Sequence, residues 1–196
     1  MATKVRSYTD KELLDKVKSL PTFAGIPQDY WILGVQSNED TPNVYDDKFY
    51  VYKGEKFIGV MTGTTNSGTY GLLNWRKWSR VGLAQIKPDE WYYNVWKRRL
   101  HNGKVEALGQ SGAFKVIRDN NNNLKSGDKE HFTVEKNKGL NFHPNTYDLR
   151  SRRKKIWTIG RWSVGCQVVN EIKKYVSFLK ISTGQNIFTY CLIKEF

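Results

Sequence analysis

The hydrophobic pattern of the first part of the chain has a helical period. Thr9 and Glu12 have the spacing of a capping box, in which each side chain bonds the other residue's backbone. The apolar positions that follow recur every three or four residues up to a proline: Leu13, Leu14, Val17, Leu20 and Pro21. We therefore predict a helix here, and we assign residues 1–27 to an N-terminal helical arm that packs on a main domain of residues 28–196.

From residue 28 onward, the pattern changes to short runs of β-branched and aromatic residues, which are typical of strands. Turn sequences such as Lys53-Gly54-Glu55 and Asn102-Gly103 separate several of these runs. The predicted strands are Tyr30–Gln36, Phe49–Tyr52, Lys56–Met61, Val81–Ile86, Val105–Leu108, Phe114–Arg118, Leu140–Phe142 and Ile187–Ile193. Because strands outnumber helices and turns join most of them, we expect a mainly β (α+β) fold: an antiparallel β sandwich or barrel with an N-terminal helix and a few short helices.

Two further segments have helical spacing. Pro88 opens the first, whose apolar stripe is Trp91, Tyr92, Val95, Trp96 and Leu100. Asn170 is a candidate N-cap for the second, whose apolar positions are Ile172, Tyr175, Val176 and Leu179. We expect both segments to be short helices.

The composition limits the class of protein. Apolar residues make up 39% of the 196 residues and aromatic residues 14%, which is enough to close a core, so disorder is not expected. The formal net charge of +13 favours an anionic partner, such as the bacterial wall, a membrane surface or nucleic acid. No stretch approaches the ~20 apolar residues of a membrane span, so no span is expected.

The N-terminal sequence and the number of cysteines further limit the class of protein. The first residues lack the apolar core of a secretory signal peptide, so we expect synthesis in the cytoplasm. Cys166 and Cys191 are too few for a disulfide scaffold, and without a Cys-x-x-Cys motif we expect no metal and no cofactor. Residues 75–80 interleave tryptophan with basic residues, but without a basic recognition helix nucleic acid is the weaker expectation.

One segment carries candidate chemistry. In Ser163-Val164-Gly165-Cys166, a cysteine directly follows a glycine, where backbone N–H groups can form an oxyanion hole. A free thiol is only slightly ionised at neutral pH and needs a base. His143, directly after the predicted strand Leu140–Phe142, is the candidate base. A buried core cysteine and a surface histidine are the structural alternatives for these two residues.

The order of these motifs resembles the catalytic domain of the L,D-transpeptidase family. In that family a histidine that ends a strand is followed by a variable loop and then by Ser-x-Gly-Cys; here the loop is residues 144–162. Upstream, residues 47–56 are similar to the family's opening hairpin, and residues 62–70 to its glycine- and threonine-rich segment. The resemblance covers roughly residues 45–170, and each motif is short.

A narrower resemblance is to phage-type proteins in which the motif reads Trp-Ser-x-Gly-Cys-Gln-Val, as residues 162–168 do. This resemblance implies a phage origin. Two departures bear on substrate position. The family usually has an arginine just beyond the cysteine, where this chain has Gln167, Val168 and Val169, and Pro144 stands where a glycine commonly follows the histidine.

The resemblance implies acyl transfer through a thioester on Cys166, with His143 as base and stem peptides of peptidoglycan as substrate. The amides of Gly165 and Cys166 are the implied oxyanion donors, and Ser163 is implied to bond the imidazole or the tetrahedral oxygen, or else to close a turn. The implied substrate-binding residues are Asn141, Arg161, Trp162 and Gln167. An amine acceptor gives a transpeptidase and water an L,D-carboxypeptidase or endopeptidase, which the sequence leaves open.

The alternative is a non-enzymatic phage virion or cell-wall-binding protein that keeps the fold without turnover. The expected partners are peptidoglycan stem peptides, an anionic wall polymer attracted to the basic run of residues 150–155, and other virion proteins. A phage origin implies that the protein is made in the host cytoplasm and then acts in the virion or at the cell wall.

Overall fold

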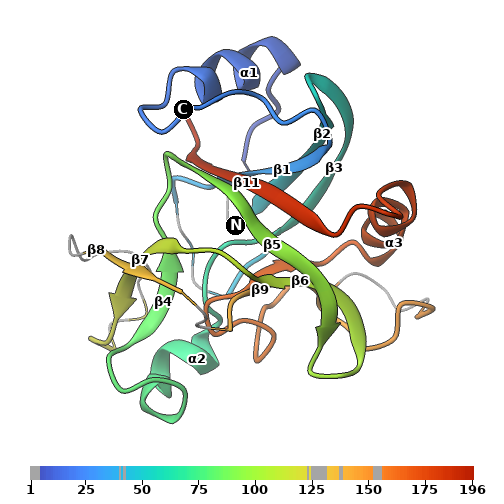
Figure 1. Cartoon of the computed structure of the whole chain (residues 1–196). Helices are drawn as coiled ribbons and strands as arrows, with labels where there is room; N and C mark the ends of the chain where they lie inside the picture. The colour runs from blue at the N-terminus through green and yellow to red at the C-terminus, as the bar shows by residue number, and fades with distance from the viewer. Residues whose placement is uncertain are drawn as a thin grey trace.

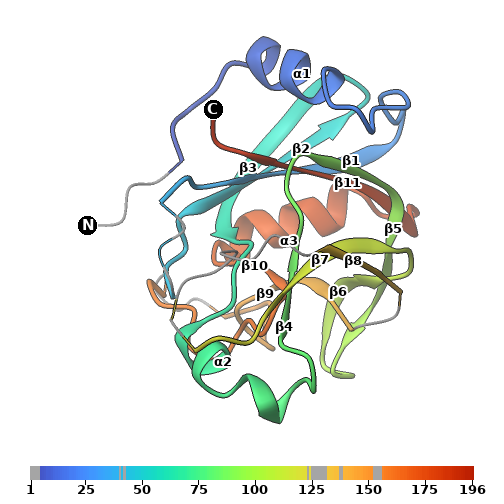
Figure 2. The same cartoon turned by 90° about the vertical axis from the view of Figure 1, so that its left-hand side faces the viewer.

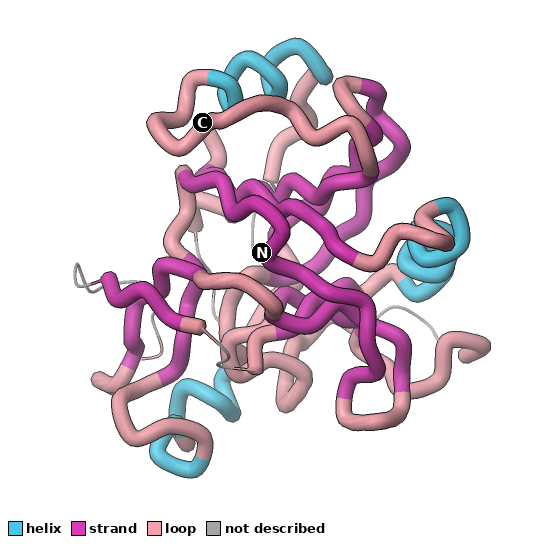
Figure 3. Tube along the Cα trace, viewed as in Figure 1, coloured by secondary structure: helices cyan, strands magenta, loops and turns pink. Residues whose placement is uncertain are grey.

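The computed structural model describes residues 5–39, 41, 43–122, 124, 132–136, 139–151 and 156–196. The elements are α1 (Asp10–Lys18), β1 (Tyr30–Gln36), β2 (Asp47–Lys53), β3 (Lys56–Thr64), α2 (Thr69–Leu73), a 3-10 turn (Trp75–Lys77), β4 (Leu83–Ile86), β5 (Glu90–His101), β6 (Val105–Gln110), β7 (Phe114–Asp119), β8 (Phe132–Glu135), β9 (Asn141–Pro144), β10 (Gln167–Val169), α3 (Ile172–Ile181) and β11 (Ile187–Lys194). The fold is mainly β, as predicted, with a helix near the N-terminus (Figures 1 and 3).

Eight strands close into a barrel in the order β1-β11-β5-β6-β9-β10-β3-β2, and β4, β7 and β8 form a separate small sheet. The pairs β1–β11 and β9–β10 are parallel, and the other pairs of the barrel are antiparallel. The predicted Asn102-Gly103 turn joins β5 to β6, and both of its residues have positive φ, as a tight hairpin turn requires.

The inner core consists of side chains that face into the barrel together with those that close it. The barrel strands contribute Ile32, Phe49, Tyr92, Trp96, Leu108, Phe142, Tyr190 and Leu192. The small sheet adds Ala84, Ile86, Phe114 and Val116, and α3 adds Tyr175, Phe178 and Leu179. Figure 2 shows α3 behind the small sheet, so these two elements cover different parts of the barrel.

A second core lies outside the barrel, under α1. The capping box predicted for Thr9 and Glu12 is present and begins this helix. Its residues Leu13 and Val17 are fully buried against the outward side chains of the strands, among them Trp31. Figure 1 shows α1 lying across the top of the sheet that β1, β2 and β11 form. Burial of this apolar face stabilises a helix that would be marginal in water at its length.

Two local predictions were wrong. The segment after Pro88 is the strand β5, not a helix. Its pairing with β11 shifts between Phe188 and Tyr190, so that Trp96 pairs with the first and Tyr92 with the second. Four positions of β5 therefore span two of β11, and this bulge gives the apolar residues a spacing close to that of a helix.

The second wrong prediction concerns the start of α3. Asn170 does not cap the helix, because Glu171 occupies the N-cap position and makes no side-chain capping bond. The Asn170 side chain instead accepts a hydrogen bond from the Thr62 hydroxyl at 2.6 Å and donates to the Ile156 carbonyl at 3.3 Å. It ties β3 to the segment before β10.

The bulge of β5 generates a prediction. Asn94 has a φ of 55°, a conformation that glycine and asparagine tolerate and β-branched residues do not. We expect Asn94→Val to lower the free energy of unfolding by about 1–2 kcal/mol and Asn94→Gly to stay within about 0.5 kcal/mol of the native protein. Urea denaturation measures both. A regular strand would give the opposite order, because valine has the higher strand propensity.

Candidate active site

The parallel pairing of β9 with β10 places the two candidate catalytic residues on neighbouring strands. In this register Gln167 lies beside Phe142 and Val168 beside His143, so Cys166 comes level with Asn141. Side chains alternate along a strand, and paired residues of parallel strands point to the same face. Asn141, His143 and Cys166 therefore share one face of the barrel wall.

The burial pattern agrees with this assignment of faces. Phe142 and Val169 belong to the inner core of the barrel. Cys166 and Val168 instead pack outside it, in a small cluster with Tyr45 and Ile159.

His143 is held as a neutral imidazole with one free nitrogen. Its Nδ1 lies 2.9 Å from the Pro144 carbonyl oxygen, and because a carbonyl only accepts, Nδ1 carries the proton. Its Nε2, which then holds the lone pair, is buried without a hydrogen-bond partner among the described residues. Burial, with a smaller contribution from His101, lowers the pKa of His143 to about 3. The site thus has an unprotonated, unpaired base at neutral pH.

His101, the last residue of β5, stacks on this imidazole. The two ring centroids are 4.1 Å apart and the planes are nearly parallel, at 9°. The Asn102 amide donates to His101 Nε2 at 3.2 Å and to the Tyr147 hydroxyl at 3.0 Å. The stack fixes the plane of the His143 ring.

Cys166 is buried, and its sulfur lies within reach of the Asn141 side chain. The Asn141 amide is 3.8 Å from the sulfur and points its N–H toward it, while its oxygen accepts a hydrogen bond from Arg99 at 3.0 Å. Burial raises the pKa of the Cys166 thiol, and the Asn141 amide and the Arg99 charge oppose that shift. Among the described residues, no hydrogen bond joins this thiol to His143. The raised pKa of the thiol and the lowered pKa of the imidazole both favour the neutral forms.

The residues just before Cys166 form a closed turn. The Ser163 hydroxyl donates to the Cys166 carbonyl at 2.8 Å and accepts from the Gly165 amide at 3.2 Å. Ser163 therefore closes the turn, and the Gly165 amide, an implied oxyanion donor, is already engaged. Gly165 has a φ of 127°, and a Cβ there would press on the Ala84 carbonyl oxygen, so only glycine fits this approach.

The other implied substrate-binding residues lie in different environments. Gln167 is fully buried and accepts from the Tyr190 hydroxyl at 2.7 Å, on the inner side of the barrel and away from Cys166. Arg161 is exposed and its guanidinium lies 4.2 Å from the centre of the Tyr70 ring. Trp162 packs against the cluster that contains Cys166 and contacts Tyr147. Of the four, Asn141 contacts the sulfur and Trp162 packs against the cluster to which Cys166 belongs.

A hollow of about 360 Å³ opens next to Asn141. Its lining comes from the hairpin of β5 and β6 and from the segment before β9: Arg99, Leu100, His101, Asn102, Gly103, Gly139 and Asn141. The hollow therefore borders the side chain that contacts the Cys166 sulfur and the ring that stacks on His143. Sequence reasoning missed Arg99 and His101, because their strand was taken for a helix.

The remaining predictions concern partners and metals. Arg152 to Lys155, most of the basic run, lie outside the described residues, and Arg150 is exposed. In the segment of alternating tryptophan and basic residues, Trp75 is buried and Trp78 is exposed. In the described ranges, no three His, Cys, Asp or Glu side chains gather as they would around a metal ion. No helix of the described part of the chain is long and apolar enough to cross a membrane.

Comparisons with protein-family models, with curated proteins and with solved structures find no match to this chain. The motifs quoted above and the geometry of β9 and β10 are therefore what a functional proposal rests on.

The burial of His143 predicts a stability change with pH. Its pKa in the folded protein, about 3, lies below the ordinary value of 6.5, so the unfolded chain binds the extra proton first as pH falls. The stability that depends on neutral His143 is fully present above about pH 6.5. As the pH falls from there to about 3, protonation of the unfolded chain lowers the free energy of unfolding by up to about 1.4 kcal/mol per pH unit. Urea denaturation between pH 7 and pH 4 should show a shallower loss for His143→Gln than for the native protein. The half-buried His101 serves as control: His101→Gln should change the slope less, and equal slopes for His143→Gln and native protein would contradict the assignment.

The environment of Cys166 predicts its reactivity. Both cysteines have a raised pKa from burial, but only Cys166 has the Asn141 amide and the Arg99 charge beside it. We expect iodoacetamide to label Cys166 faster than Cys191, with a rate that still rises with pH above the ordinary thiol pKa. Arg99→Gln should slow the labelling of Cys166 by roughly two- to three-fold, because its charge is exposed and screened. Lys97→Gln, an equal charge change two residues away, should leave the rate unchanged; peptide mass mapping over time measures both.

Proposed function

We propose that this protein is a cysteine acyl transferase or hydrolase of the L,D-transpeptidase type that acts on the peptides of peptidoglycan. The observation that carries the proposal is the common face of Cys166 and His143 on paired strands, where the free Nε2 of His143 is unprotonated. A nucleophile and a base in this relation, beside a hollow that can receive substrate, are the minimal equipment for acyl transfer.

In the proposed mechanism the thiol attacks a substrate carbonyl carbon while its proton passes to Nε2 of His143. Because both pKa values disfavour a thiolate–imidazolium pair, proton transfer accompanies the attack and does not precede it. The imidazolium then returns the proton to the leaving amine as the C–N bond breaks, which leaves a thioester on Cys166. An amine or a water molecule releases the acyl group in the second half of the reaction.

Arg99 is the residue proposed to bind the substrate through its positive charge. The family's arginine beyond the cysteine is absent here, but Arg99 brings a guanidinium to Asn141 from β5 and lines the adjoining hollow. A guanidinium binds a carboxylate through two parallel hydrogen bonds. Stem peptides carry such carboxylates, so the family's implied contact is supplied from a different strand.

The alternative is a protein that binds the wall or belongs to a virion without turnover. The engaged Gly165 amide and the raised pKa of the Cys166 thiol favour this alternative, because a preformed oxyanion hole and an activated nucleophile are both missing from this state. A phage origin remains part of the proposal in both forms.

Purified sacculi test the proposed function. Incubation with the protein should release or convert muropeptides that mass spectrometry detects, and Cys166→Ala should abolish this change by at least about a hundred-fold. Cys191→Ala is the matched control, because it truncates the other buried cysteine in a strand remote from His143; it should keep most of the activity. Binding to sacculi without any change in muropeptides would favour the non-enzymatic alternative, and the same products from Cys166→Ala would contradict the nucleophile.

A further inference from the structure

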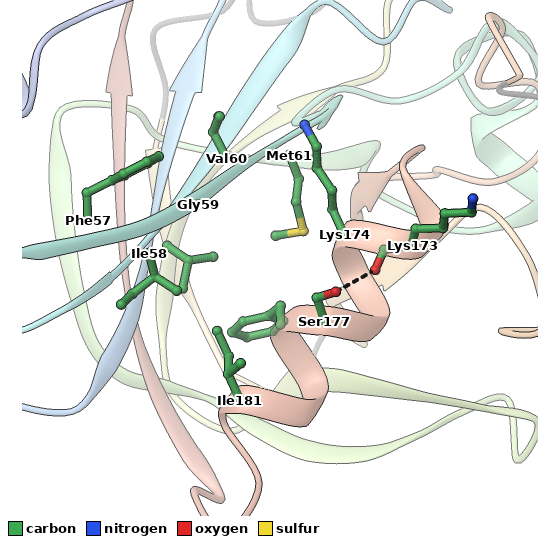
Figure 4. Close-up of a pocket in the computed structure, with 11 residues that line it drawn as sticks. Phe57, Ile58, Gly59, Val60, Met61, Lys173, Lys174, Ser177 and Ile181 are labelled. Carbon is green, nitrogen blue, oxygen red and sulfur yellow. Dashed lines mark hydrogen bonds between the residues drawn. The ribbon is translucent and has the colours of Figure 1, made fainter.

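A groove of about 470 Å³ lies between β3 and α3, on residues that the candidate active site does not use. One wall is the strand segment from Phe57 to Met61, and the other is the exposed side of α3 (Figure 4). The apolar lining includes Ile58, Met61 and Phe178, which all adjoin the inner core. A Cβ built on Gly59 meets nothing within 4 Å, so the space beside the strand is open there.

The strand wall of this groove has an open backbone position at Val60. The N–H of Thr62 donates to the Glu171 carboxylate at 2.6 Å and its carbonyl accepts from Asn170 at 3.1 Å, so both groups point away from β2. Backbone groups alternate between the two sides of a strand, so those of Val60 point to the same side as those of Thr62. The strand β10 pairs only with Gly63 and Thr64. Within the described part of the chain, Val60 makes no backbone hydrogen bond on the groove side.

We propose that this groove binds an extended polypeptide segment of a partner protein, which adds as a strand to the free edge of β3. The open N–H and carbonyl of Val60 select an extended backbone, which can pair with both groups at once. Five residues line the strand wall, but β3 bulges at Ile58, so the regular part of this edge runs from Gly59 to Met61 and fits a segment of about three residues. Alternate apolar side chains of that segment fill the space over Met61 and Ile58.

The charge of the groove selects the partner's composition. Lys173 and Lys174 line the helix wall. Lys174 is paired with the Glu171 carboxylate at 3.2 Å, whereas Lys173 forms no ion pair within the described part of the chain, and the whole chain carries +13. The bound segment is therefore acidic at the positions between its apolar residues. A second copy of this chain is a poor occupant, because its pairing along the same edge would bring the lysines of both copies together.

The test uses a fluorescein-labelled nonapeptide of alternating valine and glutamate as probe, with fluorescence anisotropy as readout. The native protein should bind it, and a version of the probe with N-methyl groups on alternate residues should bind at least ~10-fold more weakly, because it cannot complete the ladder. Equal binding of the two probes, or no binding of the first at ~1 mM, would overturn the proposal.

Three variants locate the binding. Ser177→Trp fills the groove from an exposed helix position and should weaken binding at least ~10-fold. Lys173→Glu should weaken it by roughly three- to ten-fold, more at low ionic strength, whereas Lys180→Glu makes the same charge change away from the groove and should stay within about two-fold. If Ser177→Trp fails to fold by circular dichroism, the pair of probes on the native protein decides. A concentration-dependent dimer that Ser177→Trp dissociates would assign the edge to a second copy and overturn the proposed partner.

Discussion

The short parallel pairing of β9 with β10 is the contact on which both the barrel and the candidate site depend. It joins β10 to β9 on one edge while β3 pairs with the other, so the ring of strands closes only through these few residues. A pairing so short has few ladder hydrogen bonds, and buried polar side chains support it. Gln167 accepts from Tyr190 inside the barrel, and Ser163 closes the turn that leads into β10. The motif around Cys166 is therefore a structural device as well as a candidate site.

The same arrangement explains why the thiol and the imidazole are neutral. Closing the barrel buries both residues, and burial disfavours the charged form of each, so the pKa of Cys166 rises and that of His143 falls. The stabilising contacts around them are neutral as well: a carbonyl for Nδ1, a stacked ring, and an amide beside the sulfur. The thiol and the imidazole therefore become charged only during the reaction, when the proton passes to the imidazole as the sulfur attacks a carbonyl.

Local patterns predicted the elements that obey a single period. The capping box placed α1, and runs of β-branched residues placed β1, β2, β6, β7 and β11 close to their observed bounds. The prediction for β5 was wrong because a bulge breaks the alternation of its side chains. That error hid Arg99 and His101, whose positions follow from the pairing of β5 with β6. His143 and Cys166 were found from the order of short motifs. Their common face was beyond reach, because it depends on the parallel register of two strands 23 residues apart.

The two ends of β3 have different surroundings, and Gly63 lies at the boundary between them. At Gly63 a Cβ would collide with the Val168 carbonyl and the Phe49 ring, so glycine lets β10 approach this end of the strand and close the barrel. One residue earlier, Thr62 bonds to Asn170 and Glu171, and from there the edge faces α3 across a groove instead of a strand. Helix α3 also buries Tyr175 in the inner core, where the Tyr175 hydroxyl donates to the Phe142 carbonyl in β9. Helix α3 therefore contacts both the groove beside β3 and the strand that carries His143.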